Sequence, residues 1–211
     1  MRQLEETVAH VGEYVELYQI HSATFESGVL SNSTVHEALE TCKIKKGWRI
    51  GLSVSSPKQG EVLREAMKIK MSDGNPLFDS VQCTYNLLEQ APSEALMEAR
   101  SSGMDIIIKE GLANGRLLSN ELLIDACKRE DWETESITPD ALALACILAQ
   151  PFQPRVLSGA ANAAHLISNQ KCLQICEELT ASKTDVLKEL MSGCKVSSEE
   201  YWAERSALEW N

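Results

Sequence analysis

Polar side chains that could do chemistry recur at one kind of position, the carboxyl end of a short apolar run. Six residues stand at or just past such an end: His21, Ser53, Gln82, Asn86, Lys109 and Asn162. In a (β/α) barrel, the carboxyl ends of the strands form the face at which the active site opens. The pattern therefore predicts a site at which residues far apart in the chain meet.

Five short apolar runs would carry these residues. They span positions 14–21, 48–55, 78–86, 104–110 and 155–159, and each has the length and apolar content of a strand that is buried on both faces. Helix signals lie between them, at Asn32-Ser33-Thr34, Ser56-Pro57, Pro92-Ser93-Glu94 and Thr138-Pro139-Asp140. Gly103 is placed to end the third helix. The gap between Ile108 and Val156 has room for two helices and a loop.

Strands that alternate with helices predict an α/β fold with parallel pairing through right-handed crossovers. A doubly wound sheet would carry a glycine-rich phosphate fingerprint, but the sequence has neither GxGxxG nor GxxxxGK[ST]. The polar strand ends favour a TIM-type (β/α) barrel instead. A complete eight-unit barrel takes about 250 residues, and this chain has 211. We therefore expect an incomplete barrel of about five parallel βα units plus C-terminal helices, forming one domain over residues 1–211.

Composition excludes several classes of function. The formal net charge of −11 would repel a phosphate backbone, so nucleic acid is not an expected partner. No apolar run approaches the ~20 residues that a membrane-spanning helix needs, and no secretory signal follows Met1. Seven scattered cysteines indicate free thiols in the cytoplasm or another reducing intracellular compartment.

The five runs together resemble the aldo-keto reductases. Residues 14–21 (YVELYQIH) are similar to the family's fourth barrel strand, and residues 48–53 (WRIGLS) to its fifth. Residues 81–86 (VQCTYN) resemble the sixth strand, and residues 107–118 (IIKEGLANGRLL) the seventh strand with its cofactor loop. Residues 156–160 and 166–169 resemble the eighth strand and the helix after it. The resemblance covers nearly the whole chain but only the fourth to eighth units, so we expect the chain to begin mid-fold, inside a helix at Gln3–Val11.

The resemblance implies NADP(H)-dependent reduction of aldehydes or ketones to alcohols, or the reverse oxidation. The family uses an Asp, Tyr, Lys and His tetrad, in which Tyr donates a proton to the carbonyl oxygen. Only the histidine matches here, at His21, because the other three belong to the first three units. Tyr14 and Tyr18 lie on the same strand as His21, so the sequence offers no clear replacement for the proton donor.

The resemblance also implies the cofactor contacts. Gln82 and Ser53 match residues that reach the nicotinamide carboxamide, although Val54 stands where the family has Asn. Lys109 stands where many members have an aromatic residue that stacks on nicotinamide. The loop with Gly111, Leu112 and Asn114 is the phosphate-contact candidate, because its backbone amides are free to approach a pyrophosphate.

The segment from Ser158 to Asn169 leads into a helix N-terminus, which is a ready anion site. In the family this segment, here Ser158, Gly159, Asn162, His165 and Asn169, grips the adenosine 2′-phosphate and the adenine. Gly159 and Ala160 stand where many members have Lys and Ser, and His165 stands where many have Arg. The preference for NADP(H) thus follows from the resemblance, and NAD(H) stays open.

Three hypotheses remain open. The first is an oxidoreductase acting on a small carbonyl or alcohol substrate. The second is a non-catalytic subunit or fragment that binds cofactor or a protein partner without turnover. The third is a half-barrel that self-associates through its open sheet edges. Cys172 and Cys176, spaced four residues apart, are expected to be buried thiols and not zinc ligands, and residues 199–210 are expected to form a helix packed on the barrel.

Overall fold

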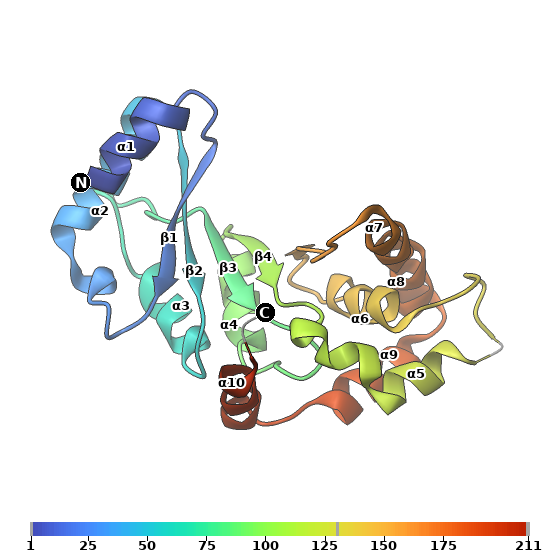
Figure 1. The fold of residues 1–211 in the computed structure, drawn as a ribbon. Coiled ribbons are helices and arrows are strands. Elements are labelled where there is room, and N and C mark those ends of the chain that lie inside the picture. Colours follow the sequence, from blue (N-terminus) through green and yellow to red (C-terminus); the bar gives the residue numbers. More distant parts are fainter. Residues whose placement is uncertain (1, 130, 210–211) are drawn as a thin grey trace.

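A parallel sheet organises the chain. The computed structural model describes residues 2–129 and 131–209. Its five strands are β1 (Leu17–Ala23), β2 (Arg49–Val54), β3 (Ser80–Thr84), β4 (Asp105–Lys109) and β5 (Arg155–Val156). They pair in parallel and in sequence order, as Figure 1 shows. A doubly wound sheet would reverse its strand order at a switch point. The sequential order is that of a (β/α) barrel, and the predicted incomplete barrel is confirmed.

Three helices cover one face of the sheet and join its first four strands. They are α2 (Ser33–Lys46), α3 (Gln59–Met67) and α4 (Ser93–Ser101), with the 3₁₀ turn η1 (Val29–Ser31) before α2. A further helix, α1 (Arg2–Val11), precedes β1. The Asn32 side chain caps α2 by accepting from the Val35 amide at 3.2 Å. Gly103, at φ +90°, donates to the Arg100 carbonyl and closes α4, as its position predicted.

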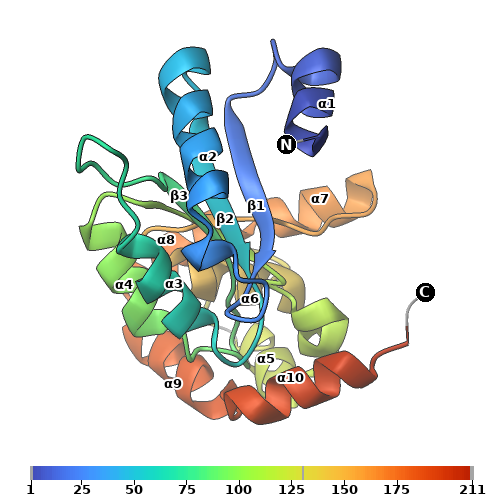
Figure 2. The ribbon, with the colours of Figure 1, turned by 90° about the vertical axis from the view of Figure 1, so that its left-hand side faces the viewer.

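A second set of helices surrounds the β4–β5 connection. That connection contains η2 (Ala113–Ser119), α5 (Glu121–Cys127) and α6 (Pro139–Leu148), which matches the predicted two helices and a loop. After β5 come α7 (Ala163–Gln170), α8 (Cys172–Ala181), α9 (Thr184–Cys194) and α10 (Ser198–Ala207). Figure 2 shows α10 running along the end of the molecule at which the strands end.

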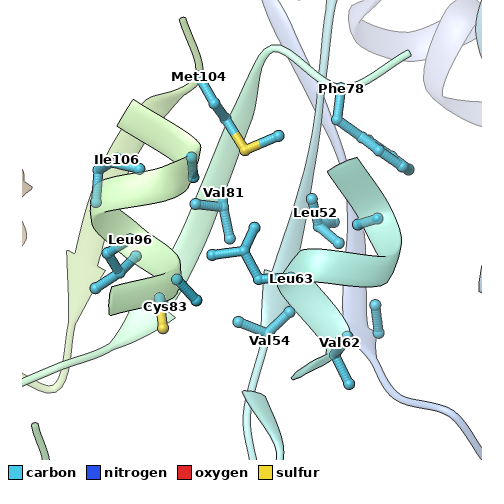
Figure 3. Close-up of a cluster of buried hydrophobic side chains, with 14 of the residues drawn as sticks. Leu52, Val54, Val62, Leu63, Phe78, Val81, Cys83, Leu96, Met104 and Ile106 are labelled. Carbon is cyan, nitrogen blue, oxygen red and sulfur yellow. The ribbon is translucent and has the colours of Figure 1, made fainter. Parts of the chain in front are cut away.

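The main core lies between the sheet and helices α2 to α4. Leu52, Val81 and Ile106 point from successive strands toward the helices, where Leu63 and Leu96 meet them (Figure 3). All five are at most 1% exposed. Since side chains alternate along a strand, the residues between them face the inside of the partial barrel. This alternation decides which strand residues can form a site.

The inner face is tightly packed around the middle of β2. A Cβ atom on Gly51 would lie 2.4 Å from Ser80 Oγ and 3.1 Å from Gln19 Cγ, so only glycine fits there. Ser80 Oγ and Gln19 Oε1 are themselves buried without a hydrogen-bond partner among the described residues. The chemistry-bearing residues lie further along the strands, toward their carboxyl ends.

The structure corrects several predicted boundaries. β1 begins at Leu17, not at residue 14, and α3 begins at Gln59, two residues after Pro57. β5 ends at Val156, so Asn162 caps α7 and is not a strand-end residue. β5 pairs with β4 through only two residues, Arg155 and Val156. No helix in the part of the chain that the structure describes is long and apolar enough to cross a membrane.

Candidate functional site

Lys109 forms the centre of a cluster at the carboxyl ends of β2, β3 and β4. Its Nζ atom donates to Ser55 Oγ at 2.6 Å and to Thr84 Oγ1 at 2.8 Å. The buried side chain of Gln59, at the start of α3, holds the main chain of Thr84 through both its N–H and its carbonyl oxygen. Burial lowers the pKa of Lys109, while the neighbouring Glu110 carboxylate acts to raise it. Three strand ends are thus tied together by one amine.

Glu110 follows Lys109 and binds the C-terminal helix. Its carboxylate accepts from Arg205 Nε at 3.0 Å and Nη2 at 2.6 Å, and from the Tyr201 hydroxyl at 3.1 Å. Asn86 Nδ2 donates to the Glu110 carbonyl and to the Tyr201 hydroxyl. Burial alone would raise the pKa of Glu110, but Arg205, Lys109 and Tyr201 together lower it. This network fixes α10 beside the strand ends.

His21 sits on an irregular stretch of β1. The pairing with β2 shifts register between Ile20 and Ala23, and Ser22 adopts a left-handed φ of 51°. The Ser22 amide donates to Ser53 Oγ at 2.8 Å, so the bulge is held against the end of β2. Bulges of this kind re-aim a side chain. The His21 side chain is exposed and lines a groove between β1, α1 and α2.

Ser53 and Gln82 are register neighbours on the inner face. Ser53 pairs with Gln82, and Gln82 pairs with Ile107 on β4. Ser53 is buried and Gln82 half-buried. The structure therefore brings Ser53, Gln82 and Lys109 onto adjacent strands, with His21 joined to them through Ser22.

The loop after β4 has an unusual backbone. Glu110, Ala113, Asn114 and Gly115 all have positive φ, from 50° to 87°. Such a compact turn places successive amides on one side of the chain, which can form an anion-binding concavity. The amides of Gly111 and Leu112 donate to no acceptor among the described residues. Gly111 packs so closely on α6 that a Cβ there would lie 3.0 Å from Leu144.

The segment from Ser158 to Asn169 forms a second unit. Gly159 turns the chain at φ +65°, and Asn162 caps α7 by accepting from the His165 amide at 2.9 Å. Asn169 is buried, and its Nδ2 donates to the Ser158 carbonyl at 2.9 Å. Its Oδ1 atom has no partner among the described residues. No hydrogen bond within residues 2–129 and 131–209 joins this unit to the cluster around Lys109.

Sequence reasoning missed the residues that support the cluster. Ser55 follows the end of β2, Thr84 ends β3 and Gln59 begins α3. Tyr201 and Arg205 lie 91 and 95 positions from Glu110 along the chain. The predicted packing of the C-terminal helix is confirmed, because Tyr201 and Trp202 are buried, but its polar partner was not predicted. The ion pair between Glu110 and Arg205 is not visible in the sequence, because it depends on the three-dimensional arrangement of the strand ends.

The paired cysteines lie on α8. Cys172 and Cys176 are half-buried free thiols. Burial raises the pKa of Cys172 to about 11 and also raises that of Cys176. The expectation that both thiols are buried is therefore only partly met, since each stays partly accessible.

Comparison with known proteins gives matches to solved structures only. No protein-family model matches the sequence, and no curated protein does. An aldo-keto reductase from Bacillus halodurans in its holo form matches 90% of this chain at 20% identity, with a TM-score of 0.67. An aldo/keto reductase from Klebsiella pneumoniae, in complex with NADP and acetate, matches 90% at 20% identity and a TM-score of 0.67. A thermostable aldo-keto reductase with the inhibitor epalrestat matches 90% at 24% identity and a TM-score of 0.65.

These matches cover only part of each relative. The chain spans 65%, 64% and 65% of the three structures, in the order given. The resemblance is thus confirmed at the level of fold: the described residues are folded like part of the (β/α) barrel seen in solved structures of aldo-keto reductases.

Proposed function

We propose that this chain belongs to an NADP(H)-dependent oxidoreductase that reduces aldehydes or ketones to alcohols, or catalyses the reverse reaction. The observation that carries the proposal is the grouping of Ser53, Gln82 and Lys109 at the carboxyl ends of adjacent barrel strands, next to His21. In a (β/α) barrel this face carries the active site. The substrate would be a small carbonyl compound or alcohol.

Two features fit a dinucleotide. The unpartnered, buried Asn169 Oδ1 is an acceptor that an amino group such as that of adenine could satisfy. The free amides of Gly111 and Leu112, in a loop of positive φ, could hold a pyrophosphate. NADPH, when bound, would supply a hydride. Ser53 and Gln82 would orient the nicotinamide of the cofactor, and His21 would hold the substrate oxygen.

Few groups in this chain could bind the 2′-phosphate of NADPH. Residues 158–165 include no Lys or Arg, so the N-terminus of α7 and His165 are the groups available there. We expect His165→Arg to tighten NADPH binding about tenfold, because a guanidinium can form a charge-assisted pair with the phosphate. NADH binding should stay unchanged. Fluorescence titration at fixed ionic strength measures both.

A matched control separates this effect from net charge. His10→Arg adds the same charge on the exposed face of α1, and should leave the affinity for NADPH as in the wild type. Equal tightening for NADPH and NADH in His165→Arg would mean that His165 does not lie at the 2′-phosphate.

Turnover tests the proposed activity. Oxidation of NADPH by the chain should depend on an added aldehyde or ketone, and should saturate with it. Absence of that dependence, with NADPH binding retained, would favour the second candidate, a cofactor-binding subunit without catalysis. One observation favours that candidate: His21 lies on β1, the edge strand, and its side chain is exposed.

A further inference from the structure

The amine of Lys109 differs from that of Lys43 in the groups that accept its hydrogen bonds. Its side chain is 17% exposed and faces the inside of the barrel, where Ser55 and Thr84 accept its hydrogen bonds. Both partners are neutral hydroxyls. Lys43 is buried to a similar degree, with 20% of its side chain exposed, but it pairs with the Asp79 carboxylate at 2.8 Å. Lys109 is thus partly desolvated, and no carboxylate among the described residues accepts a hydrogen bond from its amine; Glu110 Oε1 lies further away, at 3.8 Å.

The charged groups around Lys109 do not outweigh the effect of burial on its amine. Glu110 Oε1 lies 3.8 Å from its Nζ atom, but that carboxylate is already engaged in two directions by Arg205 and by Tyr201. The positive charge of Arg205 opposes protonation of the amine, while Glu110 and the thiol of Cys83 favour it. Burial is the largest influence and lowers the pKa of Lys109. The neutral, nucleophilic amine is therefore more accessible here than on an exposed lysine.

We propose that Lys109 is a nucleophilic amine that captures small aldehydes as a protonated imine, with Ser55 and Thr84 as the hydrogen-bond partners that orient the amine. A partly desolvated lysine amine is an established type of nucleophile toward carbonyl carbon. This reaction needs no dinucleotide, so the inference goes beyond the proposed function and does not rest on it.

The ammonium of Lys109, whose side chain is 17% exposed, first gives one proton to solvent water, and the amine lone pair then forms a C–N bond to the aldehyde carbon. The carbonyl electron pair moves to oxygen, which takes up a proton from the nitrogen. A proton from solvent then adds to that oxygen, the C–O bond breaks, and one water leaves. The product is an imine that carries the single positive charge of the original ammonium.

Reductive trapping tests this directly. The wild-type chain is treated near pH 7 with limiting propionaldehyde and sodium cyanoborohydride, without NADPH, and is then digested with trypsin. A propyl group on Lys109 blocks cleavage after it, so the label appears in the peptide spanning residues 101–116. We expect most of the label on Lys109, with little on Lys43 and on the exposed Lys68. Label on Lys109 no greater than on Lys43 would overturn the proposal.

A pH series and a variant strengthen the test. Labelling of Lys109 should reach half its maximum at a lower pH than labelling of Lys68, because its amine loses its proton more easily. Coincident pH curves would overturn the proposal even if Lys109 is labelled. Ser55→Ala, which removes one of the two hydroxyls that orient the amine, should slow labelling of Lys109 and leave that of Lys68 unchanged. An unchanged rate at Lys109 would show that Ser55 does not orient the amine for attack.

Discussion

Replacing Arg205 with Met is expected to lower the free energy of unfolding by about 3 kcal/mol, the lower end of the range for breaking a buried ion pair. Arg205 engages both oxygens of Glu110 from α10, and the Glu110 side chain is only 13% exposed. Methionine would keep much of the apolar volume of the arginine side chain. It would leave the partly buried Glu110 carboxylate without its guanidinium partner, with only Lys109 and Tyr201 beside it. Urea denaturation followed by circular dichroism measures the loss.

Arg64→Met is the matched control for this prediction. Arg64 also pairs with a glutamate through two nitrogens, but Glu98 is 50% exposed. Surface pairs of this kind contribute about 0–1 kcal/mol. If Arg205→Met cost no more than Arg64→Met, α10 would not be held by the Glu110 pair.

The same pair predicts an acid sensitivity. The pKa of Glu110 is lowered in the fold, so its stabilisation is complete above the unfolded value of about 4.3 and disappears as the pH falls through the folded pKa. The slope of stability against pH in that acid range should be shallower in Arg205→Met than in the wild type. An unchanged slope would assign the acid sensitivity to other carboxylates.

Replacing His21 with Ala is expected to lower turnover about 100-fold, the lower range for loss of a residue that assists proton transfer. The bulge at Ser22 and its bond to Ser53 hold His21 beside the strand ends. The side chain is exposed and packs on nothing that the fold needs, so the variant should fold normally. The affinity for NADPH should be unchanged, because the cofactor contacts that we propose lie on β2 to β4, on the loop after β4 and on α7.

His10→Ala controls for the removal of an exposed imidazole elsewhere, on α1. It should retain full turnover. If His21→Ala retained full turnover as well, His21 would neither hold the substrate oxygen nor assist proton transfer, and its assignment would be wrong.

The fold was predictable from the sequence because its signals are local. Apolar runs such as residues 104–110 and capping residues such as Asn32 and Thr138 mark strands and helices within a few positions. The order of the strands then follows from the short crossovers. Strand limits were less predictable: β5 has only two paired residues, although the apolar run there is longer.

The candidate site was only partly predictable, because hydrogen-bond partners are set by tertiary structure. Strand-end residues such as Gln82 and Lys109 could be identified from position alone. The partners that orient them could not, since Lys109 binds Ser55 and Thr84, which lie 54 and 25 positions away. The bulge at Ser22 also has no local signature, because it depends on the Ser53 hydroxyl of another strand.

The central claim is that a dinucleotide binds across the carboxyl ends of the strands, and hydrogen exchange with and without NADPH tests it most directly. We expect saturable protection of backbone amides in residues 109–115 and 158–169, with none in α1. The free amides of Gly111 and Leu112 should be among those protected. No saturable protection at millimolar NADPH, or protection confined to the groove between β1, α1 and α2, would contradict it.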